Sequence, residues 1–143
     1  MAIASGQRIT PALLRRLRPA YYTAQATSDL GGVVTTTLVP GATVTFTVET
    51  AAAWYVDAVF DVDTTGASTG LALGYCEVDG TIVSGQATCA NEVLTDRHSV
   101  AQQWSGVFAS AGSHTIRLKV TLPTAVSVRT TNTRFRVTIQ EVV

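Results

Sequence analysis

The chain has 143 residues and a mass of 15.0 kDa, a size that predicts one domain able to bury a core without a metal or a disulfide. Hydrophobic residues make up 46% and charged residues only 14%, which excludes a disordered chain, and the formal net charge of zero argues against attraction of the whole protein to nucleic acid. The 23 threonines favour extended backbone, and no apolar run approaches the roughly 18 residues of a membrane-spanning helix.

Residues 1–20 form the basic part of the chain, with four of its ten basic residues and no acidic one. Their apolar patch is too short for a secretory leader, so folding in a cytoplasm is expected. Thr10 followed by Pro11 is typical of a helix start, good helix formers follow over 12–17, and Pro19 ends the helix.

A helix of this length is not stable alone, so its apolar stripe must dock on its own domain, on a sister subunit or on a larger assembly. The sequence therefore predicts an N-terminal anchor segment over residues 1–32 and a β-sandwich domain over residues 33–143. The residues expected to bind a partner are Ile9, Leu13, Leu14, Arg15, Arg16, Leu17 and Arg18.

From residue 33 onward, apolar and polar residues alternate with a period of two, as in half-buried strands. Trp54 and Trp104 fall at inward positions, and the Asp79-Gly80 pair predicts a tight hairpin. The predicted strands cover 33–38, 43–48, 54–62, 71–78, 81–89, 100–108, 114–122 and 135–139. One buried face per strand and no helical crossovers predict an all-β fold, an antiparallel jelly-roll-type β-sandwich preceded by a short helix.

The two cysteines are expected to remain thiols. In the predicted hairpin Cys76 faces Val83, and Cys89 lies about six residues further along the partner strand at about 3.3 Å per residue. This separation exceeds the roughly 7 Å limit between the Cα atoms of a disulfide.

Two patterns resemble catalytic sites, and each fails a structural requirement. Residues 66–70 match the G-x-S-x-G nucleophile pattern around Ser68, but a strand-like run follows where the motif needs a helix. Asp96, His98 and Ser99 place an acid, a base and a hydroxyl close in sequence, yet neighbours on a strand point to opposite faces. The sequence predicts no catalytic residue, no cofactor and no enzyme; a hydrolase that uses Ser68 is the enzymatic alternative.

The acidic run after residue 56 is the candidate metal site. It opens like an EF-hand loop at Asp61 but lacks the glutamate required at the twelfth position. Asp57, Asp61 and Asp63 share one strand face, where two of them near a loop form a candidate calcium site, against the simpler interpretation of a solvated acidic face. No set of histidines and cysteines has zinc-ligand spacing, so no metal is predicted.

The segment from Ser5 to Leu17 resembles the start of many small virion proteins of tailed phages and prophages of actinobacteria. The stretches 104–108 and 111–118 are similar to the trimeric jelly rolls of fibre tips and of C1q/tumour-necrosis-factor-like domains. The resemblance implies a structural role on a virion, as a homotrimer bound to major capsid or tail proteins. It implies no catalytic residue, and neither nucleic acid nor membrane is an expected partner.

Tyr21, Tyr22 and Tyr55 are the aromatic residues expected outside the core. An outer aromatic ring over a shallow groove is typical of a carbohydrate-binding module, which is the alternative function and makes a host-surface glycan a partner. The sequence leaves open whether the protein belongs to the head, as a capsid decoration or head fibre, or to the tail.

Overall fold

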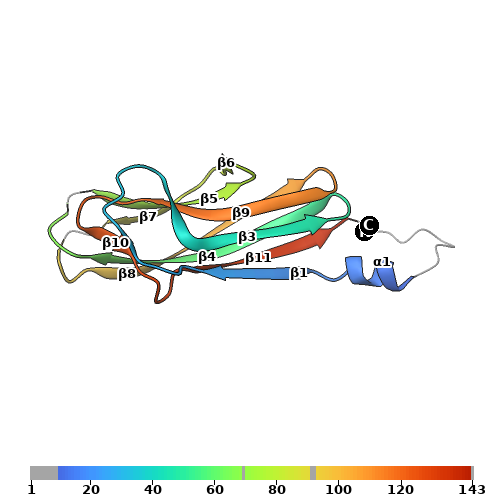
Figure 1. The fold of residues 1–143 in the computed structure, drawn as a ribbon, viewed down its shortest axis with the longest axis horizontal. Coiled ribbons are helices and arrows are strands. Elements are labelled where there is room, and N and C mark those ends of the chain that lie inside the picture. The colour runs from blue at the N-terminus through green and yellow to red at the C-terminus, as the bar shows by residue number, and fades with distance from the viewer. Residues whose placement is uncertain (1–9, 69, 91–92, 143) are drawn as a thin grey trace.

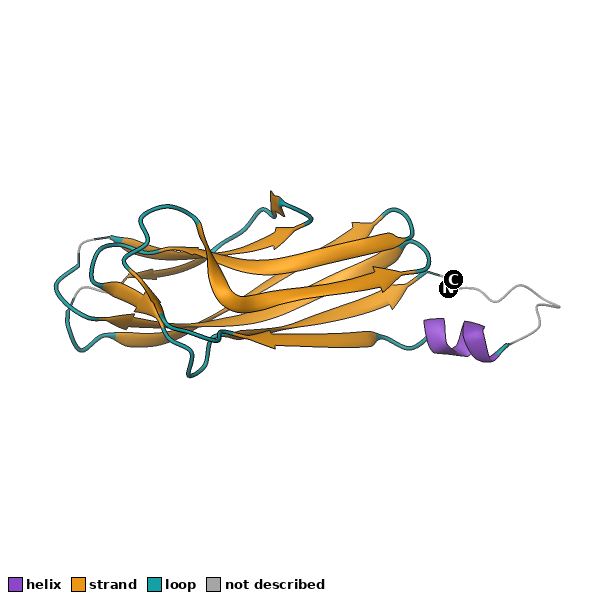
Figure 2. Cartoon of the chain, viewed as in Figure 1, coloured by secondary structure: helices purple, strands orange, loops and turns teal. Residues whose placement is uncertain are grey.

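The computed structural model describes residues 10–68, 70–90 and 93–142, which form one helix and eleven strands (Figures 1 and 2). The strands make two sheets packed face to face, and the helix lies beyond one end of them. The elements are α1 (Pro11–Arg16), β1 (Ala20–Gln25), β2 (Leu30–Gly31), β3 (Thr37–Val48), β4 (Ala52–Thr64), β5 (Leu71–Val78), β6 (Thr81–Ile82), β7 (Ala87–Ala90), β8 (Arg97–Phe108), β9 (Gly112–Thr121), β10 (Val126–Val128) and β11 (Arg134–Glu141).

The strand order identifies a jelly roll. Sheet A has the order β1-β11-β4-β10-β2 with β8 also on β4, and sheet B has the order β3-β9-β5-β6 with β7 also on β5. β10 and β11 pair with successive parts of β4, so they occupy one strand position; β1 with β2, and β6 with β7, share positions in the same way. Counting each shared position once and numbering the eight positions in chain order gives 1-8-3-6 for sheet A and 2-7-4-5 for sheet B. All neighbours are antiparallel, and these two orders are the pairing of two Greek keys. The predicted fold class is confirmed.

The sandwich begins earlier than the sequence predicts. β1 pairs all six of its residues with β11 and so forms an edge of sheet A. Tyr22, expected outside the core, is half buried and stacks on Phe46 with ring centroids 4.9 Å apart. The predicted boundary between residues 1–32 and 33–143 is therefore wrong, because residues 20–31 supply backbone and side chains that complete the sandwich.

The predicted strand at 33–38 is also wrong in its first part. Val34 is 68% exposed in a loop, and β3 begins only at Thr37. β3 then continues through residues 39–42, where its pairing with β9 shifts register. Gly41 has a φ of 78°, and a Cβ atom there would lie 2.4 Å from Thr27 Cγ2, so only glycine permits this bulge.

The core lies between the two sheets and contains both tryptophans, each 5% exposed, as predicted. Trp54 packs near Phe108, and the Trp104 ring stands edge-on to Phe60, with centroids 6.1 and 6.4 Å apart respectively. Trp104 Nε1 donates to the carbonyl of Gly85 at 2.9 Å. β8 belongs to sheet A, whereas β6 and β7 belong to sheet B. This bond therefore connects the two sheets.

Cys76 and Cys89 are buried thiols and form no disulfide with each other, as predicted. Residues 79–80 make the expected tight turn, both with positive φ, and the Val83 N–H donates to the Cys76 carbonyl at 2.9 Å. Cys89 lies opposite Ala72, roughly 13 Å along β5 from Cys76 at 3.3 Å per residue. Burial raises the pKa of the Cys76 thiol to about 12, so this thiol stays protonated at neutral pH.

Candidate functional site

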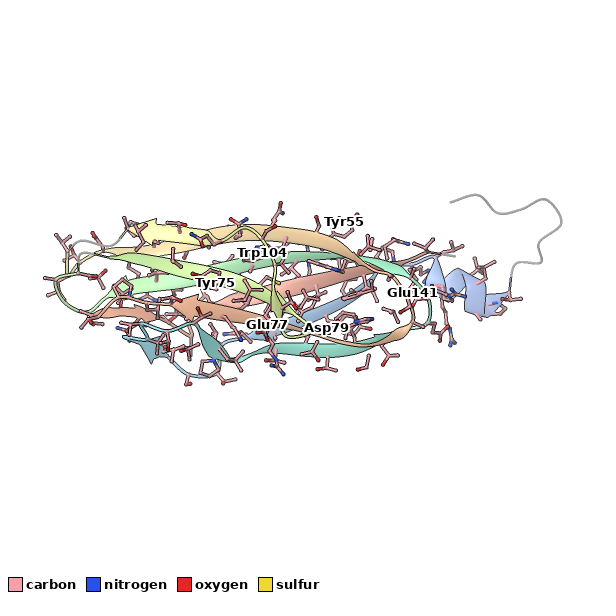
Figure 3. The ribbon with its side chains drawn as sticks, turned by 90° about the horizontal axis from the view of Figure 1, so that it is seen from above. Tyr55, Tyr75, Glu77, Asp79, Trp104 and Glu141 are labelled. Carbon is pink, nitrogen blue, oxygen red and sulfur yellow. The ribbon has the colours of Figure 1, made fainter. Side chains whose placement is uncertain are left out.

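α1 is fixed to the end of the sandwich at which β11 ends (Figures 1 and 3). Thr10 caps the helix as predicted, since its Oγ1 accepts the Leu13 N–H at 3.2 Å. Arg16 reaches from the helix to the sandwich: its Nε lies 3.1 Å from Glu141 Oε2, and its Nη2 donates to Thr50 Oγ1 at 2.9 Å. Of the three docking partners that the sequence left open, α1 therefore uses its own domain.

This docking divides the predicted anchor residues into two groups. Leu13 is buried, Arg16 binds Glu141, and Leu17 is half buried with its carbonyl accepting the Gln140 amide at 3.3 Å. The exposed members are Leu14 and Arg15 on α1 and Arg18 two residues after its end, and we call these three residues the outward face of α1. Ile9 lies outside the described residues.

The outer face of sheet A carries two exposed tyrosines in one row. Tyr21 on β1 lies opposite Thr138, and Thr138 lies opposite Tyr55 on β4. Two strand spacings, roughly 10 Å, separate the tyrosines. Tyr21 is 62% and Tyr55 51% exposed, so both rings are available from solvent, as predicted (Figure 3 shows Tyr55).

The next row of this face holds a fixed carboxylate. Gln103 Nε2 donates to Asp57 Oδ1 at 2.6 Å, and Arg136 Nη2 donates to Asp57 Oδ2 at 3.1 Å. The same guanidinium lies 6.0 Å from the centre of the Tyr21 ring. Arg136 therefore connects the two rows. Asp57, Gln103 and Arg136, which come from three strands, hold one another in fixed positions.

Two surface hollows adjoin this carboxylate. One has a volume of about 370 Å³ and is lined by Tyr55, and the other has a volume of about 660 Å³ and is lined by Arg134; Asp57 and Gln103 line both. We call this surface the sheet A groove. It is defined by Tyr55, Asp57, Gln103, Arg134 and Arg136, which line the hollows, and by Tyr21, which lines neither hollow but lies beside Arg136.

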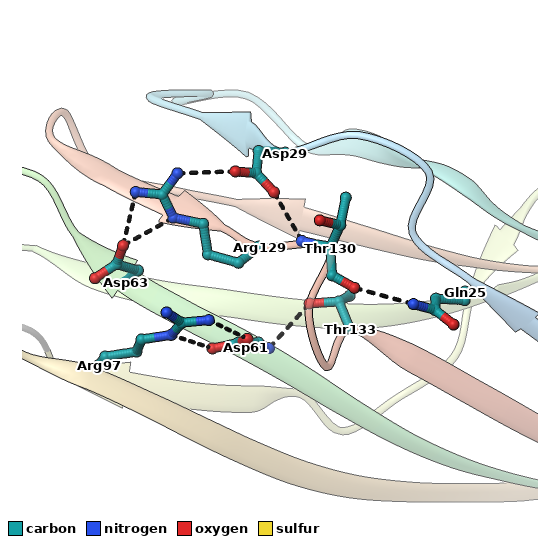
Figure 4. A network of polar contacts seen from close by, with 8 residues as sticks. All are labelled: Gln25, Asp29, Asp61, Asp63, Arg97, Arg129, Thr130 and Thr133. Atoms are coloured by element: carbon teal, nitrogen blue, oxygen red, sulfur yellow. Dashed lines mark hydrogen bonds and ion pairs between the residues drawn. The ribbon is translucent and has the colours of Figure 1, made fainter.

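The other two aspartates of the candidate calcium site hold arginines (Figure 4). Asp61 is buried, with 1% exposure, and its two carboxylate oxygens accept from Arg97 at 2.9 and 2.8 Å. Asp63 accepts from Arg129, which also binds Asp29. Each of these carboxylates therefore has its own cationic partner, and the described residues contain no cluster of three potential metal ligands.

The ion pair of Asp29 predicts a pH dependence of stability. Hydrogen bonds from the Arg129 guanidinium and from the Thr130 N–H lower the pKa of Asp29 below its usual value. A carboxyl with a lowered folded-state pKa stabilises the fold above its unfolded pKa of about 4, and this contribution is lost as the pH falls through the folded value. We expect Asp29→Asn to cost no more than about 1 kcal/mol at pH 7, because the pair is exposed.

Urea denaturation of both proteins, repeated as the pH is lowered below about 4, measures this effect. The difference between wild type and Asp29→Asn should shrink toward zero in acid. Glu49→Gln is the control, since the Glu49 carboxylate makes no ion pair with a described residue. An equal loss in both variants at all pH values would contradict the assignment.

The residues of the two sequence patterns with catalytic spacing lie in the loops before β5 and β8 and on β8 itself. β5 begins three residues after Ser68, where the nucleophile motif needs a helix. The Ser68 Oγ is buried and makes no hydrogen bond with a described residue. Asp96 accepts the Val93 N–H at 3.0 Å within the loop before β8, while His98 is an exposed residue of that strand.

No family model and no curated protein match the chain. Among solved structures, latent PorU from Porphyromonas gingivalis is similar with a TM-score of 0.53 and 10% identity, over 86% of this chain and 13% of that chain. A chain from a particle of infectious bursal disease virus is similar with a TM-score of 0.46 and 16% identity, over 86% of this chain and 31% of that chain. The C-terminal domain of EclA, a sugar-binding protein, is similar with a TM-score of 0.31 and 14% identity, over 96% of this chain and 81% of that chain.

These similarities bear on the fold alone, and the PorU structure supports the assignment of a β-sandwich. The chain spans about an eighth of the PorU chain and about a third of the viral chain. In the described part of the chain, no helix has the length and apolar character to span a membrane.

Proposed function

We propose that the protein is a non-enzymatic structural subunit of a phage virion, a capsid decoration, head-fibre or small tail-associated protein. The outward face of α1 attaches it to major capsid or tail proteins, and the jelly roll points away from the particle as a homotrimer. The observation that carries the proposal is that α1 is fixed to one end of the sandwich while Leu14, Arg15 and Arg18 remain exposed there.

The chemistry of these three residues suits attachment to an acidic protein surface. Leu14 offers an apolar contact, and Arg15 and Arg18 offer planar cations that bind carboxylates with two hydrogen bonds each. Because the Arg16–Glu141 contact already orders the helix, attachment does not need to order it again, which favours affinity. Binding only to the assembled particle would also stabilise that particle by mass action.

The jelly roll is an architecture of viral capsid and lectin domains, which supports a structural role without choosing between head and tail. The resemblance of residues 5–17 to small virion proteins of actinobacterial phages supports the phage assignment. The homotrimer rests on the resemblance of residues 104–108 and 111–118 to trimeric jelly rolls.

Mass spectrometry of gradient-purified virions tests the proposal. The virions are those of the phage, or of the induced prophage, whose genome carries the gene. We expect the chain to be present in many copies per particle, and light scattering of the purified full chain to give the mass of a trimer. Absence of the chain from intact virions would overturn the virion assignment, and a monomer in solution would overturn the homotrimer.

A further inference from the structure

We propose that the sheet A groove binds an acidic oligosaccharide, with one pyranose ring on Tyr55 and a sugar carboxylate on Arg134. This inference does not rest on the proposed virion function, because the groove shares no residue with the outward face of α1. It rests on three features of the groove: its aromatic rings, its fixed polar groups and its unbalanced positive charge.

The aromatic rings are suited to an extended chain of sugars. Tyr21 and Tyr55 lie in one row across β1, β11 and β4, roughly 10 Å apart, a span that two consecutive pyranose rings cover. Both rings are exposed and both come from strands rather than loops, so they are held in place before the ligand arrives. The apolar face of a pyranose packs on such a ring, while its hydroxyl groups remain free for polar contacts.

The polar groups lie in the row directly beside the tyrosines. Asp57 is held by Gln103 on one side and by Arg136 on the other, so its carboxylate cannot turn away when a hydroxyl approaches. Because Gln103 uses Nε2 to bind Asp57, its Oε1 remains as an acceptor for a second hydroxyl. The groove therefore offers acceptors and donors in the row next to the Tyr55 ring, two residues along β4, an arrangement that fits vicinal hydroxyl groups.

The charge of the groove favours an acidic sugar. Arg134 and Arg136 line the larger hollow together with one carboxylate, that of Asp57. Arg136 binds this carboxylate, whereas Arg134 makes no ion pair with any described residue. An unpaired guanidinium at the edge of a hollow is suited to a two-bond contact with a carboxylate. Uronic and sialic acids supply a carboxylate on a pyranose ring, whereas neutral glucans do not.

Isothermal titration of the full chain tests the proposal. The ligands are oligosaccharides of matched length: uronate, sialylated and hyaluronate chains on one side, and cello- and malto-oligosaccharides on the other. We expect saturable binding of at least one acidic ligand, weakened by added salt, and no saturable binding of the neutral ones. Failure of every acidic ligand, or equal binding of a neutral one, would overturn the proposal.

Variants then locate the site. Tyr55→Ala should weaken binding about tenfold or more, while Tyr55→Phe, which keeps the ring, should bind within about threefold of wild type. Arg134→Gln should remove most of the preference for acidic over neutral ligands and reduce the salt dependence. Tyr75→Ala is the matched control, because Tyr75 lies on sheet B, and it should bind like wild type.

Circular dichroism establishes that each variant is folded before titration. Binding that survives Tyr55→Ala, or that falls equally in Tyr55→Ala and Tyr75→Ala, would contradict the assignment of the groove. Neither result bears on the presence of the chain in virions, so the two proposals fail separately.

Discussion

Replacing Trp54 or Trp104 with alanine is expected to lower the free energy of unfolding by about 3–5 kcal/mol in each case. Both indoles are almost completely buried between the sheets, so truncation leaves a large cavity that the surrounding strands fill only in part. The backbone beside Trp54 is closely fitted to it: a Cβ atom at Gly106 would lie 2.4 Å from the Trp54 ring. Trp104→Ala additionally leaves the Gly85 carbonyl without its indole partner.

Urea denaturation of each variant measures these losses. Tyr55→Ala is the matched control, since Tyr55 follows Trp54 directly but faces solvent, and it should cost less than about 1 kcal/mol. A loss below about 1 kcal/mol for either tryptophan would mean that the inner and outer faces of sheet A are exchanged.

Reversing the charges on the outward face of α1 is expected to weaken attachment to the particle strongly. In the double variant Arg15→Glu/Arg18→Glu, two exposed cations become anions that repel an acidic partner surface, and affinity should fall at least about tenfold. The stability of the domain should change little, because neither arginine forms an ion pair within the described residues. Co-sedimentation with particles assembled without the chain measures the attachment.

Two control variants distinguish a loss of attachment at α1 from a general effect of net charge and from a loss of stability. Arg134→Glu/Arg136→Glu changes the net charge by the same amount on sheet A, and it should leave attachment intact. Arg16→Ala should act on stability instead, by about 1–3 kcal/mol, because it removes a charged hydrogen bond to Glu141 and another to Thr50. Equal loss of attachment in the two charge-reversed variants would contradict the role of α1.

The jelly roll could be predicted from the sequence because most of its strands alternate strongly. Trp54 and the residues that follow it place large apolar side chains on every second position, and a tight turn at 79–80 fixes one hairpin. β1 was not predicted, because its inward positions are Tyr22 and Ala24, whose small or amphipathic side chains give a weak apolar period. Its place in sheet A depends on an unpaired edge of β11, which only the folded structure provides.

The candidate sites depended even more on tertiary structure. The helix and its cap could be predicted from the sequence. The different roles of Arg16 and Arg15 could not, because Arg16 is held by Glu141 near the other end of the chain, whereas Arg15 stays on the surface. Asp61 looked like part of an acidic face, yet it is buried by a bidentate contact with Arg97, 36 residues away. The sheet A groove joins residues from four strands, and its rows arise from strand register rather than from spacing along the sequence.

α1 lies beyond one end of the sandwich, so the two ends of the domain differ. The helix and the end of β11 lie at one end of the sandwich, whereas the loop between β2 and β3 lies in the half of the sandwich away from α1 (Figure 1). Val34 and Thr35 are exposed in that loop, so a peptide inserted between them disturbs no buried side chain. Since β4 spans thirteen residues, roughly 40 Å at 3.3 Å per residue, such an insert would stand most of a strand length from α1. A particle coated through α1 would thereby display foreign epitopes at a distance from its shell, with the sandwich as a rigid spacer.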